Sequence, residues 1–319
     1  MNILVTGCAG FIGFSLSEFL LKKGHNITGI DNFDDYYSVE LKKKRVKILK
    51  KYKKFKFKKV DISKKHNLFF LKKIKYSHVF HFAAQAGVRY SLINPKKYYN
   101  SNVLGYLNLI LTLNKMDLKK VIYASSSSVY GEQKKYPTTE NMKLNAKNPY
   151  ANSKVINEIM SKIFAESYNI NFIGLRFFTV YGEWGRPDMF IIKLLNCISK
   201  KKTFQLNNSG DHYRDFTYIS DILKGCQKLI NYQPKSLHTI FNICAGKKIN
   251  ILQLTQKIIS YYPKAKIKNI LANKADVYQT FGSNKKIVKE LKLKKFIKLE
   301  IGLKNTIKWF NKYNIQKLI

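Results

Sequence analysis

The sequence predicts an α/β protein built on a doubly wound, parallel Rossmann sheet, with a smaller C-terminal α/β lobe that binds the substrate. Two observations predict this fold. Short β-rich runs alternate with helical stretches through the first half of the chain, which is the pattern of βαβ units. A glycine-rich turn, Gly7 to Gly13, directly follows the first of these runs and opens the first helical stretch.

The β-rich runs give the order of the expected elements. Strands are expected over residues 2–6, 26–30, 55–60, 78–82, 121–125 and 172–176. Helical periodicity covers 14–23 and 102–115. The alternation weakens beyond Arg176, although 240–244 has the composition of one more buried strand. That strand would return the chain to the first sheet, so the two domains are expected to be discontinuous.

The formal net charge of +40 raises nucleic-acid or anionic-membrane binding as a hypothesis. Only five of the 59 basic residues are arginines, however, and the lysines are spread along the whole chain. A base-reading protein would use arginine forks and a localised basic stripe. A+T-rich codons encode lysine and also Asn, Ile, Tyr and Phe, which are abundant here. The base composition of the source genome therefore explains the many lysines without a basic functional surface. We therefore expect no nucleic-acid partner.

The few arginines are informative, because lysine would serve wherever only charge matters. Most of them fall inside the motifs described below, where a planar, bidentate donor can bind phosphate or carboxylate. These are Arg89, Arg176, Arg186 and Arg214. The fifth, Arg45, lies outside the motifs.

The cysteines and the apolar runs indicate the cellular compartment in which the protein is expected to lie. Cys8, Cys197, Cys226 and Cys244 show no paired spacing, which predicts neither a zinc site nor a disulfide framework. No apolar run approaches the roughly 18 residues of a membrane span. The first strand begins at Asn2, which leaves no room for a signal peptide. We expect a soluble, cytoplasmic protein with no bound metal and no membrane partner.

The glycine-rich turn predicts a dinucleotide site. Its glycines permit a tight turn and close approach of a pyrophosphate, and the helix N-terminus supplies amide donors. The second strand ends at Asp31, where a carboxylate accepts hydrogen bonds from a ribose diol and would repel a 2′-phosphate. No arginine follows in residues 32–35, so the sequence favours NAD over NADP. The alternative is that the glycines only form turns. The turn residues expected to contact the cofactor are Gly7, Gly10, Phe11, Ile12 and Gly13.

Tyr150 and Lys154 form the candidate catalytic pair. They are four residues apart in an expected helix and would share one face. An ammonium close to a phenol lowers the pKa of the phenol from about 10 toward working pH, so Tyr150 can act as general base. Ser126, at the end of the fifth strand, would bond to the same substrate oxygen. Such a pair is also common on exposed helices, and its value here comes from following the dinucleotide motif and the serine run.

The chain resembles the extended short-chain dehydrogenase/reductases over essentially its whole length, and within them it is most similar to UDP-glucuronate 4-epimerases. The resemblance rests on long strings that follow the glycine turn and flank the Tyr150/Lys154 pair. They are residues 31–33 with Tyr36 and Tyr37, 83–91, the serine run 125–128, 176–182, 184–189 and 214–219.

The resemblance implies an oxidation and a reduction on one NAD. Tyr150 would take the proton of the sugar 4-hydroxyl while hydride passes from C4 to the nicotinamide. The 4-keto sugar would then turn over and receive the hydride on its other face, converting UDP-glucuronate to UDP-galacturonate. Lys154 would also contact the cofactor. Further cofactor contacts are implied at Asn32, Asp61, Ile62, Ala83, Ala84, Gln85 and Asn102.

The resemblance also implies a substrate site. Arg186 would bind the sugar carboxylate, with an internal pair to Asp188 as the alternative. Arg214 would bind the UDP diphosphate, and Arg89 is a second anion contact. Asp276 would face the uridine ribose, although residues 273–275 depart from the family string there. The remaining implied contacts are Ser126, Ser127, Ser128, Tyr150 and Thr179.

Neighbouring reactions are less compatible with the sequence. Relatives that dehydrate or decarboxylate nucleotide sugars carry an acidic residue where this chain has Ser128, and a hydroxyl is a poor proton carrier near neutral pH. A UDP-glucose or UDP-N-acetylhexosamine 4-epimerase remains open, as does a non-catalytic nucleotide- or nucleic-acid-binding protein. The expected domains are an NAD-binding domain over 1–176 with a returning segment at about 215–245, and a nucleotide-sugar lobe over 177–214 and 246–319. A homodimer through helices 102–115 and 150 onward is also implied.

Overall fold

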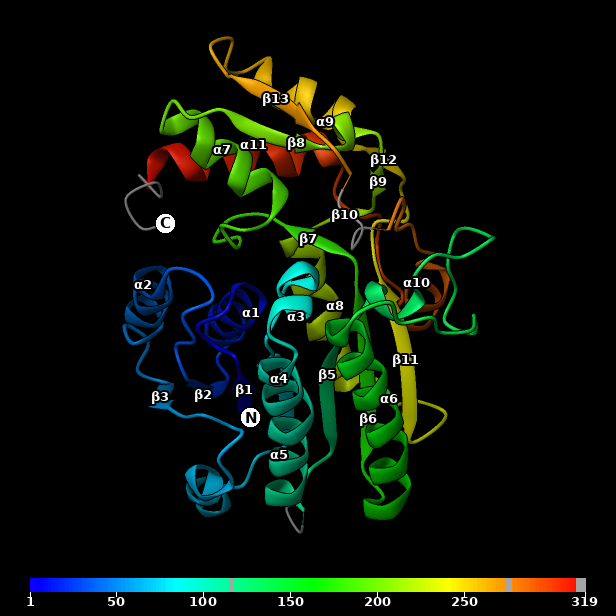
Figure 1. Ribbon diagram of the computed structural model, residues 1–319. Coiled ribbons are helices and arrows are strands. Elements are labelled where there is room, and N and C mark those ends of the chain that lie inside the picture. The colour runs from blue at the N-terminus through cyan, green and yellow to red at the C-terminus, as the bar shows by residue number, and fades with distance from the viewer. Residues whose placement is uncertain (115–116, 273–276, 314–319) are drawn as a thin grey trace.

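The structure, a computed structural model, describes residues 1–114, 117–272 and 277–313. Within these ranges seven parallel strands form the central sheet in the order β11-β6-β5-β4-β1-β2-β3 (Figure 1). The order reverses between β1 and β4, as a doubly wound sheet requires. The strands are β1 (Asn2–Thr6), β2 (Asn26–Asp31), β3 (Phe55–Lys59), β4 (His78–His81), β5 (Lys120–Ser126), β6 (Asn171–Phe177) and β11 (His238–Ile243). The fold class and the returning strand are therefore confirmed.

Burial on both faces explains why these runs form strands. Successive side chains of a strand point to opposite faces. Ile3 and Val5 of β1 accordingly belong to one buried cluster and Leu4 to another. Parallel strands covered on both faces are near-continuous apolar runs, and four of the five residues of β1 are buried.

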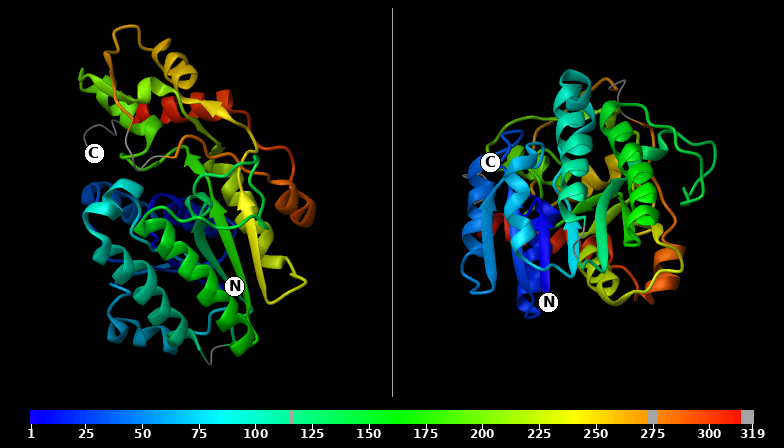
Figure 2. Two further views of the ribbon diagram at one scale, coloured as in Figure 1. Left: turned by 45° about the vertical axis from the view of Figure 1, so that its right-hand side comes forward. Right: turned by 90° about the horizontal axis from the view of Figure 1, so that it is seen from below.

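Helices cover both faces of this sheet (Figure 2). On one face α1 (Phe11–Lys22) packs against α2 (Val39–Leu49) and α8 (Ile219–Asn231). On the other, the 3₁₀ segment η1 (Lys65–Lys73) packs against α5 (Gly105–Leu113), which contacts α6 (Pro149–Tyr168). The helix expected at 102–115 starts with a π-helical turn, η2 (Tyr99–Leu104), and follows α3 (Val88–Ile93) and α4 (Pro95–Tyr98).

A smaller lobe lies beyond the carboxyl ends of the sheet strands (Figure 1). Its strands pair two by two, β7 with β10, β9 with β12 and β8 with β13. Its elements are β7 (Thr179–Tyr181), α7 (Phe190–Ser199), β8 (Phe204–Asn207), η4 (Asn208–Gly210), β9 (Tyr213–Arg214), β10 (Phe216–Tyr218), β12 (Ile249–Asn250), α9 (Ile251–Ile259), β13 (Ile267–Ile270) and α11 (Leu299–Lys312). The segments η3 (Ser127–Tyr130) and α10 (Lys285–Leu291) complete the chain.

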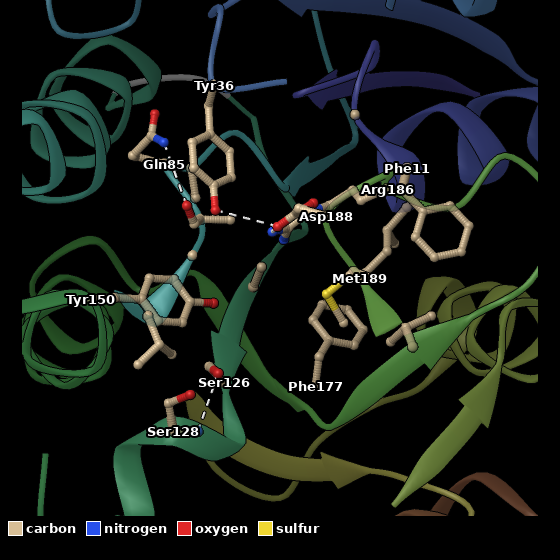
Figure 3. A pocket seen from close by; sticks show the side chains of 18 of the residues that line it. Phe11, Tyr36, Gln85, Ser126, Ser128, Tyr150, Phe177, Arg186, Asp188 and Met189 are labelled. Atoms are coloured by element: carbon tan, nitrogen blue, oxygen red, sulfur yellow. Dashed lines mark hydrogen bonds and ion pairs between the residues drawn. The ribbon is translucent and has the colours of Figure 1, made fainter. Parts of the chain in front are cut away.

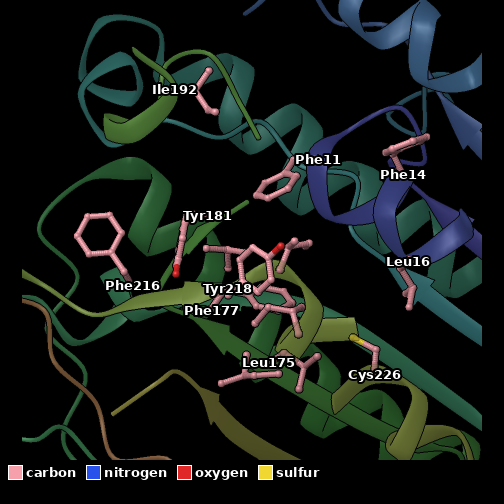
Figure 4. Close-up of a cluster of buried hydrophobic side chains, with 14 of the residues drawn as sticks. Phe11, Phe14, Leu16, Leu175, Phe177, Tyr181, Ile192, Phe216, Tyr218 and Cys226 are labelled. Carbon is pink, nitrogen blue, oxygen red and sulfur yellow. The ribbon is translucent and has the colours of Figure 1, made fainter. Parts of the chain in front are cut away.

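One apolar cluster joins the lobe to the sheet. Figure 4 shows Phe11 of α1 pointing toward Tyr218 of β10 and Phe177 of β6, and Phe14 of α1 belongs to the same cluster. The same cluster continues to Trp309 of α11. The segment 215–245 supplies α8, which packs on α1, and β11, which joins the sheet. The domain bounds given above stay a prediction. No helix in the described ranges is both long and apolar enough to cross a membrane.

Candidate active site

A cavity of about 690 Å³ lies between the carboxyl ends of the sheet strands and the smaller lobe. Its lining includes the glycine turn, the ends of β2, β4 and β5, and the start of α6. The smaller lobe contributes residues between Thr179 and Thr280. Open α/β sheets bind ligands at this edge, so the cavity lies where the fold predicts a site.

The glycine turn forms one end of the cavity. Gly7 has a positive φ of 72°, a backbone conformation that residues other than glycine rarely adopt. A Cβ on Gly13 would lie 2.1 Å from the Gly7 carbonyl oxygen, so only glycine lets α1 approach the turn this closely. Gly10 is the N-cap residue of α1 and, having no side chain, puts no capping group over the first amides. These amides and the helix dipole suit a bound phosphate group.

Asp31 ends β2 beside this turn and lines the cavity. Its carboxylate accepts hydrogen bonds from the backbone N–H of Ala9 at 3.0 Å and of Phe33 at 2.9 Å. Burial raises the pKa of Asp31, and these two hydrogen bonds and the positive charge of Lys42 act in the opposite direction. The two backbone donors fix the orientation of the carboxylate against the turn.

Tyr150 lies at the start of α6, with its hydroxyl pointing into the cavity toward Ser126 (Figure 3). The helix starts there because the Asn148 side chain caps it, accepting from the N–H of Ala151 at 2.9 Å. Ser126 ends β5 and accepts from the N–H of Ser128 at 3.2 Å. The strand end and the helix start therefore bring a phenol and a serine hydroxyl to one point of the cavity.

The electrostatics of the pair differ from the sequence-based prediction. Lys154 is buried, and its ammonium donates to the carbonyl oxygen of Ala124 at 2.9 Å. Burial lowers the pKa of Lys154 to about 8. Burial also raises the pKa of Tyr150, while its hydrogen bond with Ser126 and the charge of Arg186 act in the opposite direction. The prediction that Lys154 brings the pKa of Tyr150 below its ordinary value is therefore wrong for these surroundings, because desolvation outweighs the favourable contacts.

Arg186 lines the same cavity and pairs with Asp188 (Figure 3). Its Nε lies 3.0 Å from Asp188 Oδ1, and its Nη2 donates to Oδ2. The Tyr36 hydroxyl also donates to Asp188 Oδ2, at 3.3 Å. The ion pair lowers the pKa of Asp188 against the opposing effect of its burial. The internal pair that was the alternative for Arg186 is thus present, on the wall of the cavity.

A family model described as the NAD dependent epimerase/dehydratase family matches residues 3–244. The chain belongs to this family. It is 40% identical over 319 residues to the UDP-glucuronate 4-epimerase of Thermodesulfobacterium geofontis, covering 98% of this chain and 97% of the relative. It is 42% identical over 314 residues to an uncharacterized protein of Methanocaldococcus jannaschii, covering 97% of this chain and 96% of the relative.

Solved structures of family members have the same fold. A UDP-glucuronic acid 4-epimerase from Bacillus cereus, in complex with UDP-glucuronic acid and NAD, superposes with a TM-score of 0.91 at 29% identity, covering 98% of this chain and 100% of that one. A UDP-glucose 4-epimerase from Thermotoga maritima with UDP-glucose gives 0.89 at 27% identity, covering the same shares of the two chains.

The cavity of this family member brings together almost all residues that the sequence singled out. From the cofactor set, the lining residues are Gly7, Gly10, Phe11, Ile12, Gly13, Asp31, Asn32, Asp61, Ile62, Ala83, Ala84, Gln85, Tyr150 and Lys154. From the substrate set, they are Arg89, Ser126, Ser127, Ser128, Tyr150, Thr179, Arg186 and Arg214. Asp276 lies outside the described residues.

Asn102 is the one described residue of the cofactor set that does not line the cavity, since it is fully buried, and its cofactor contact stays a prediction. Its side-chain oxygen accepts from the N–H of Gln85 at 2.7 Å, and its Nδ2 donates to the Gln85 carbonyl at 3.1 Å and to Ser153 Oγ at 2.9 Å. These hydrogen bonds occupy the side-chain amide of Asn102. Asn102 therefore holds the Gln85 backbone against α6 from a position behind the cavity lining.

Arg176 does not line the cavity, and the prediction that its planar fork binds a carboxylate is confirmed on an internal one. It is buried, and its Nε and Nη2 bind the two carboxylate oxygens of Glu158 at 2.9 and 2.7 Å. Its fork therefore binds an internal carboxylate between β6 and α6.

Sequence reasoning missed several polar lining residues. Lys42 of α2 lies near Asp31, Ser101, Lys147 and Asn148 also line the cavity, and the lobe supplies further residues. A signal for Lys42 existed, because Leu41, Lys42 and Val46 fall on the buried face of one helix, where a lysine is unusual. The missed residues of the lobe are Lys193, Gln205, Asn207 and His212.

Proposed function

We propose that the protein is an NAD-dependent UDP-sugar 4-epimerase whose substrate is UDP-glucuronate and whose product is UDP-galacturonate. One observation carries the proposal. The Tyr150 hydroxyl shares one cavity with the glycine turn and with Arg186 and Arg214 from beyond the sheet. This arrangement suits a reaction at a carbon placed between a dinucleotide and an anionic nucleotide sugar, and relatives named as UDP-glucuronate 4-epimerases support it.

The residues at the cofactor end fit NAD. The turn around Gly7 and Gly13 has no room for side chains, which leaves the amides at the start of α1 for a pyrophosphate. Asp31 suits a ribose diol and opposes a 2′-phosphate. These residues would hold NAD, which would supply reversible hydride-transfer chemistry and would not be consumed.

Tyr150 is the group that we propose moves the proton at the sugar 4-oxygen. Its hydroxyl points toward Ser126, which can bind the same sugar oxygen and orient it. Lys154 is buried and Tyr150 is half-buried, and both line the cavity. Ser128 lines the cavity where relatives that dehydrate carry an acid, so this chain has no carboxylic acid at that place in its sequence. A site that moves protons only at the 4-oxygen leaves C5 and C6 unchanged, so removal of hydride from C4 and its return to the other face would give epimerisation and not dehydration.

The sugar carboxylate needs its own contact. The oxidised uronate is a β-keto acid, which loses carbon dioxide when the bond to its carboxylate lies perpendicular to the carbonyl plane. Arg186 uses Nε and Nη2 for Asp188, and its Nη1 can donate to the carboxylate. Ser127, Ser128 and Thr179 line the same cavity and supply further hydroxyl donors. Together these donors would hold the carboxylate away from the perpendicular orientation.

A homodimer is part of the proposal. Apolar side chains are exposed on the helices that the family resemblance implicates, among them Leu104 and Leu111 on η2 and α5 and Ile159 and Ile163 on α6. Covering them with a second copy would remove apolar surface from water. Sedimentation equilibrium of the purified protein tests this, and a monomer at micromolar concentration would contradict it.

Product analysis tests the substrate. The purified protein is incubated separately with UDP-glucuronate, UDP-glucose and UDP-N-acetylglucosamine, and the products are resolved by chromatography. We expect UDP-galacturonate from the first. Conversion of UDP-glucose without conversion of UDP-glucuronate would refute the substrate assignment. The mass of nucleotide released on denaturation tests whether NAD is the bound cofactor.

A further inference from the structure

Arg45 is the arginine that lies outside the sequence motifs, and it is fully buried. It lies on the face of α2 that carries Leu41, Val46 and Leu49. Burying a guanidinium is costly unless its donors are satisfied. Its position therefore calls for a specific set of partners.

The guanidinium fork of Arg45 binds two segments that are far apart in the sequence, the glycine turn and the segment before Arg186. Its Nη1 donates to the carbonyl oxygen of Ala9 in the glycine turn at 2.8 Å and to the Tyr37 hydroxyl at 2.9 Å. Its Nη2 donates to the carbonyl oxygens of Trp184 at 2.6 Å and of Gly185 at 3.4 Å. One planar group thus joins the cofactor turn to the segment that leads directly into Arg186. A lysine ammonium, a single point donor, cannot span these positions.

Both segments held by Arg45 are constrained. The N–H of Ala9 donates to Asp31, so the Ala9 peptide is fixed on both sides. Trp184 has a φ of 60°, which is unfavourable for a bulky side chain and persists only where the surroundings enforce it. Its ring packs on Phe14 of α1 and on Trp309 of α11, with centroids 5.3 and 5.4 Å apart. A shift of the turn would therefore be transmitted to the Trp184 peptide.

We propose that Arg45 is a positioning residue that couples dinucleotide binding at the glycine turn to nucleotide-sugar binding in the other lobe. It acts through the Trp184–Gly185 peptide, which sets the direction of Arg186. The four oxygen partners of Arg45 are neutral, so a pyrophosphate at the turn would add the negative charge that this buried cation lacks in its direct contacts. The inference rests on the proposed function for the identity of the two ligands.

The inference can be tested by measuring how the binding of NAD changes the affinity for UDP, which does not require turnover. UDP lacks the hexuronate whose C4 would face the nicotinamide, so we expect coupling between UDP and NAD to pass through the protein. UDP is titrated calorimetrically into NAD-depleted and NAD-loaded protein, and NAD into protein with and without UDP. The two experiments must give the same factor. We expect NAD to tighten UDP binding by about fivefold or more in the wild type. Arg45→Lys is expected to bring this factor close to one.

The matched control is Lys44→Gln, which changes an exposed residue beside Arg45 and should keep the wild-type factor. A wild type without coupling would overturn the inference, and so would an Arg45→Lys protein of lower Tm that keeps the full factor. Such a protein would show that Arg45 serves only folding. Intact coupling in a protein that does not epimerise UDP-glucuronate would refute the proposed substrate alone.

A second measurement keeps Arg45 in place, in case Arg45→Lys fails to fold. The chain has two tryptophans, so Trp309→Phe leaves Trp184 as the sole tryptophan. We expect NAD binding to change the emission of Trp184 in this variant. Unchanged emission under saturating NAD, with binding verified by calorimetry, would overturn the inference.

Discussion

The guanidinium of Arg186 and the carboxylate of Asp188 form a two-point ion pair on the cavity wall, with Nε and Oδ1 3.0 Å apart. An arginine that already holds a carboxylate has a defined orientation. It therefore presents its remaining nitrogen to the cavity at little further entropic cost. The pair does not remove Arg186 from the site but prepares its third nitrogen for an anionic ligand.

Replacing Arg186 by lysine tests this role. A lysine cannot bind Asp188 at two points and a substrate carboxylate at a third. Losing a charge-assisted hydrogen bond costs about 1.5 to 3 kcal/mol, so KM for UDP-glucuronate should rise roughly 10- to 100-fold. Turnover of UDP-glucose, where detectable, serves as the control because it has no carboxylate to lose. An equal loss on both substrates would contradict a carboxylate contact.

Tyr150→Phe should remove the proton-transfer group while keeping the ring. General acid–base groups contribute about 10² to 10⁴ in rate, so kcat should fall within that range. The amount of NAD bound per protein should stay at the wild-type value. Tyr261→Phe is the control, since Tyr261 is exposed and does not line the cavity. Full turnover by Tyr150→Phe would sink the assignment of the base.

The pH dependence of kcat should reflect Lys154. Burial lowers its pKa to about 8, so its ammonium is present below that pH and is lost as the pH rises through it. Deprotonation weakens the hydrogen bond from Lys154 to the Ala124 carbonyl and removes the charge that we expect to face the cofactor, so kcat should fall above about pH 8. Lys154→Arg keeps the charge at all accessible pH values, so its lower kcat should not show this alkaline limb. Identical alkaline limbs in the two proteins would assign the limb to another group.

Stability should depend strongly on the buried pair of Arg176 and Glu158. Side chains of both are less than a tenth exposed, and Ser125 Oγ also donates to Glu158. Removing one partner of a buried pair leaves an uncompensated charge and costs about 3 to 5 kcal/mol. Glu158→Gln should lower the free energy of unfolding in urea by about 3 kcal/mol. Glu40→Gln, which breaks the exposed pair with Lys43, should change it by less than about 0.5 kcal/mol.

Sequence reasoning predicted what local patterns determine. Strands such as β1 and β4 are short apolar runs next to turns, and the Tyr150/Lys154 spacing follows directly from helix geometry. What it missed depends on contacts between distant parts of the chain. Arg45 binds a carbonyl 139 residues away, and Asn102 one 17 residues away. The rise in the pKa of Tyr150 comes from burial in the assembled cavity, which no local spacing encodes.

The apolar cluster that runs from α1 to α11 gives the two halves of the molecule one shared interior. Cutting the chain after Arg176 would leave each fragment with a large apolar surface exposed to water. Neither fragment should then persist as a free module, and co-expressed halves should be recovered only as a reassociated pair.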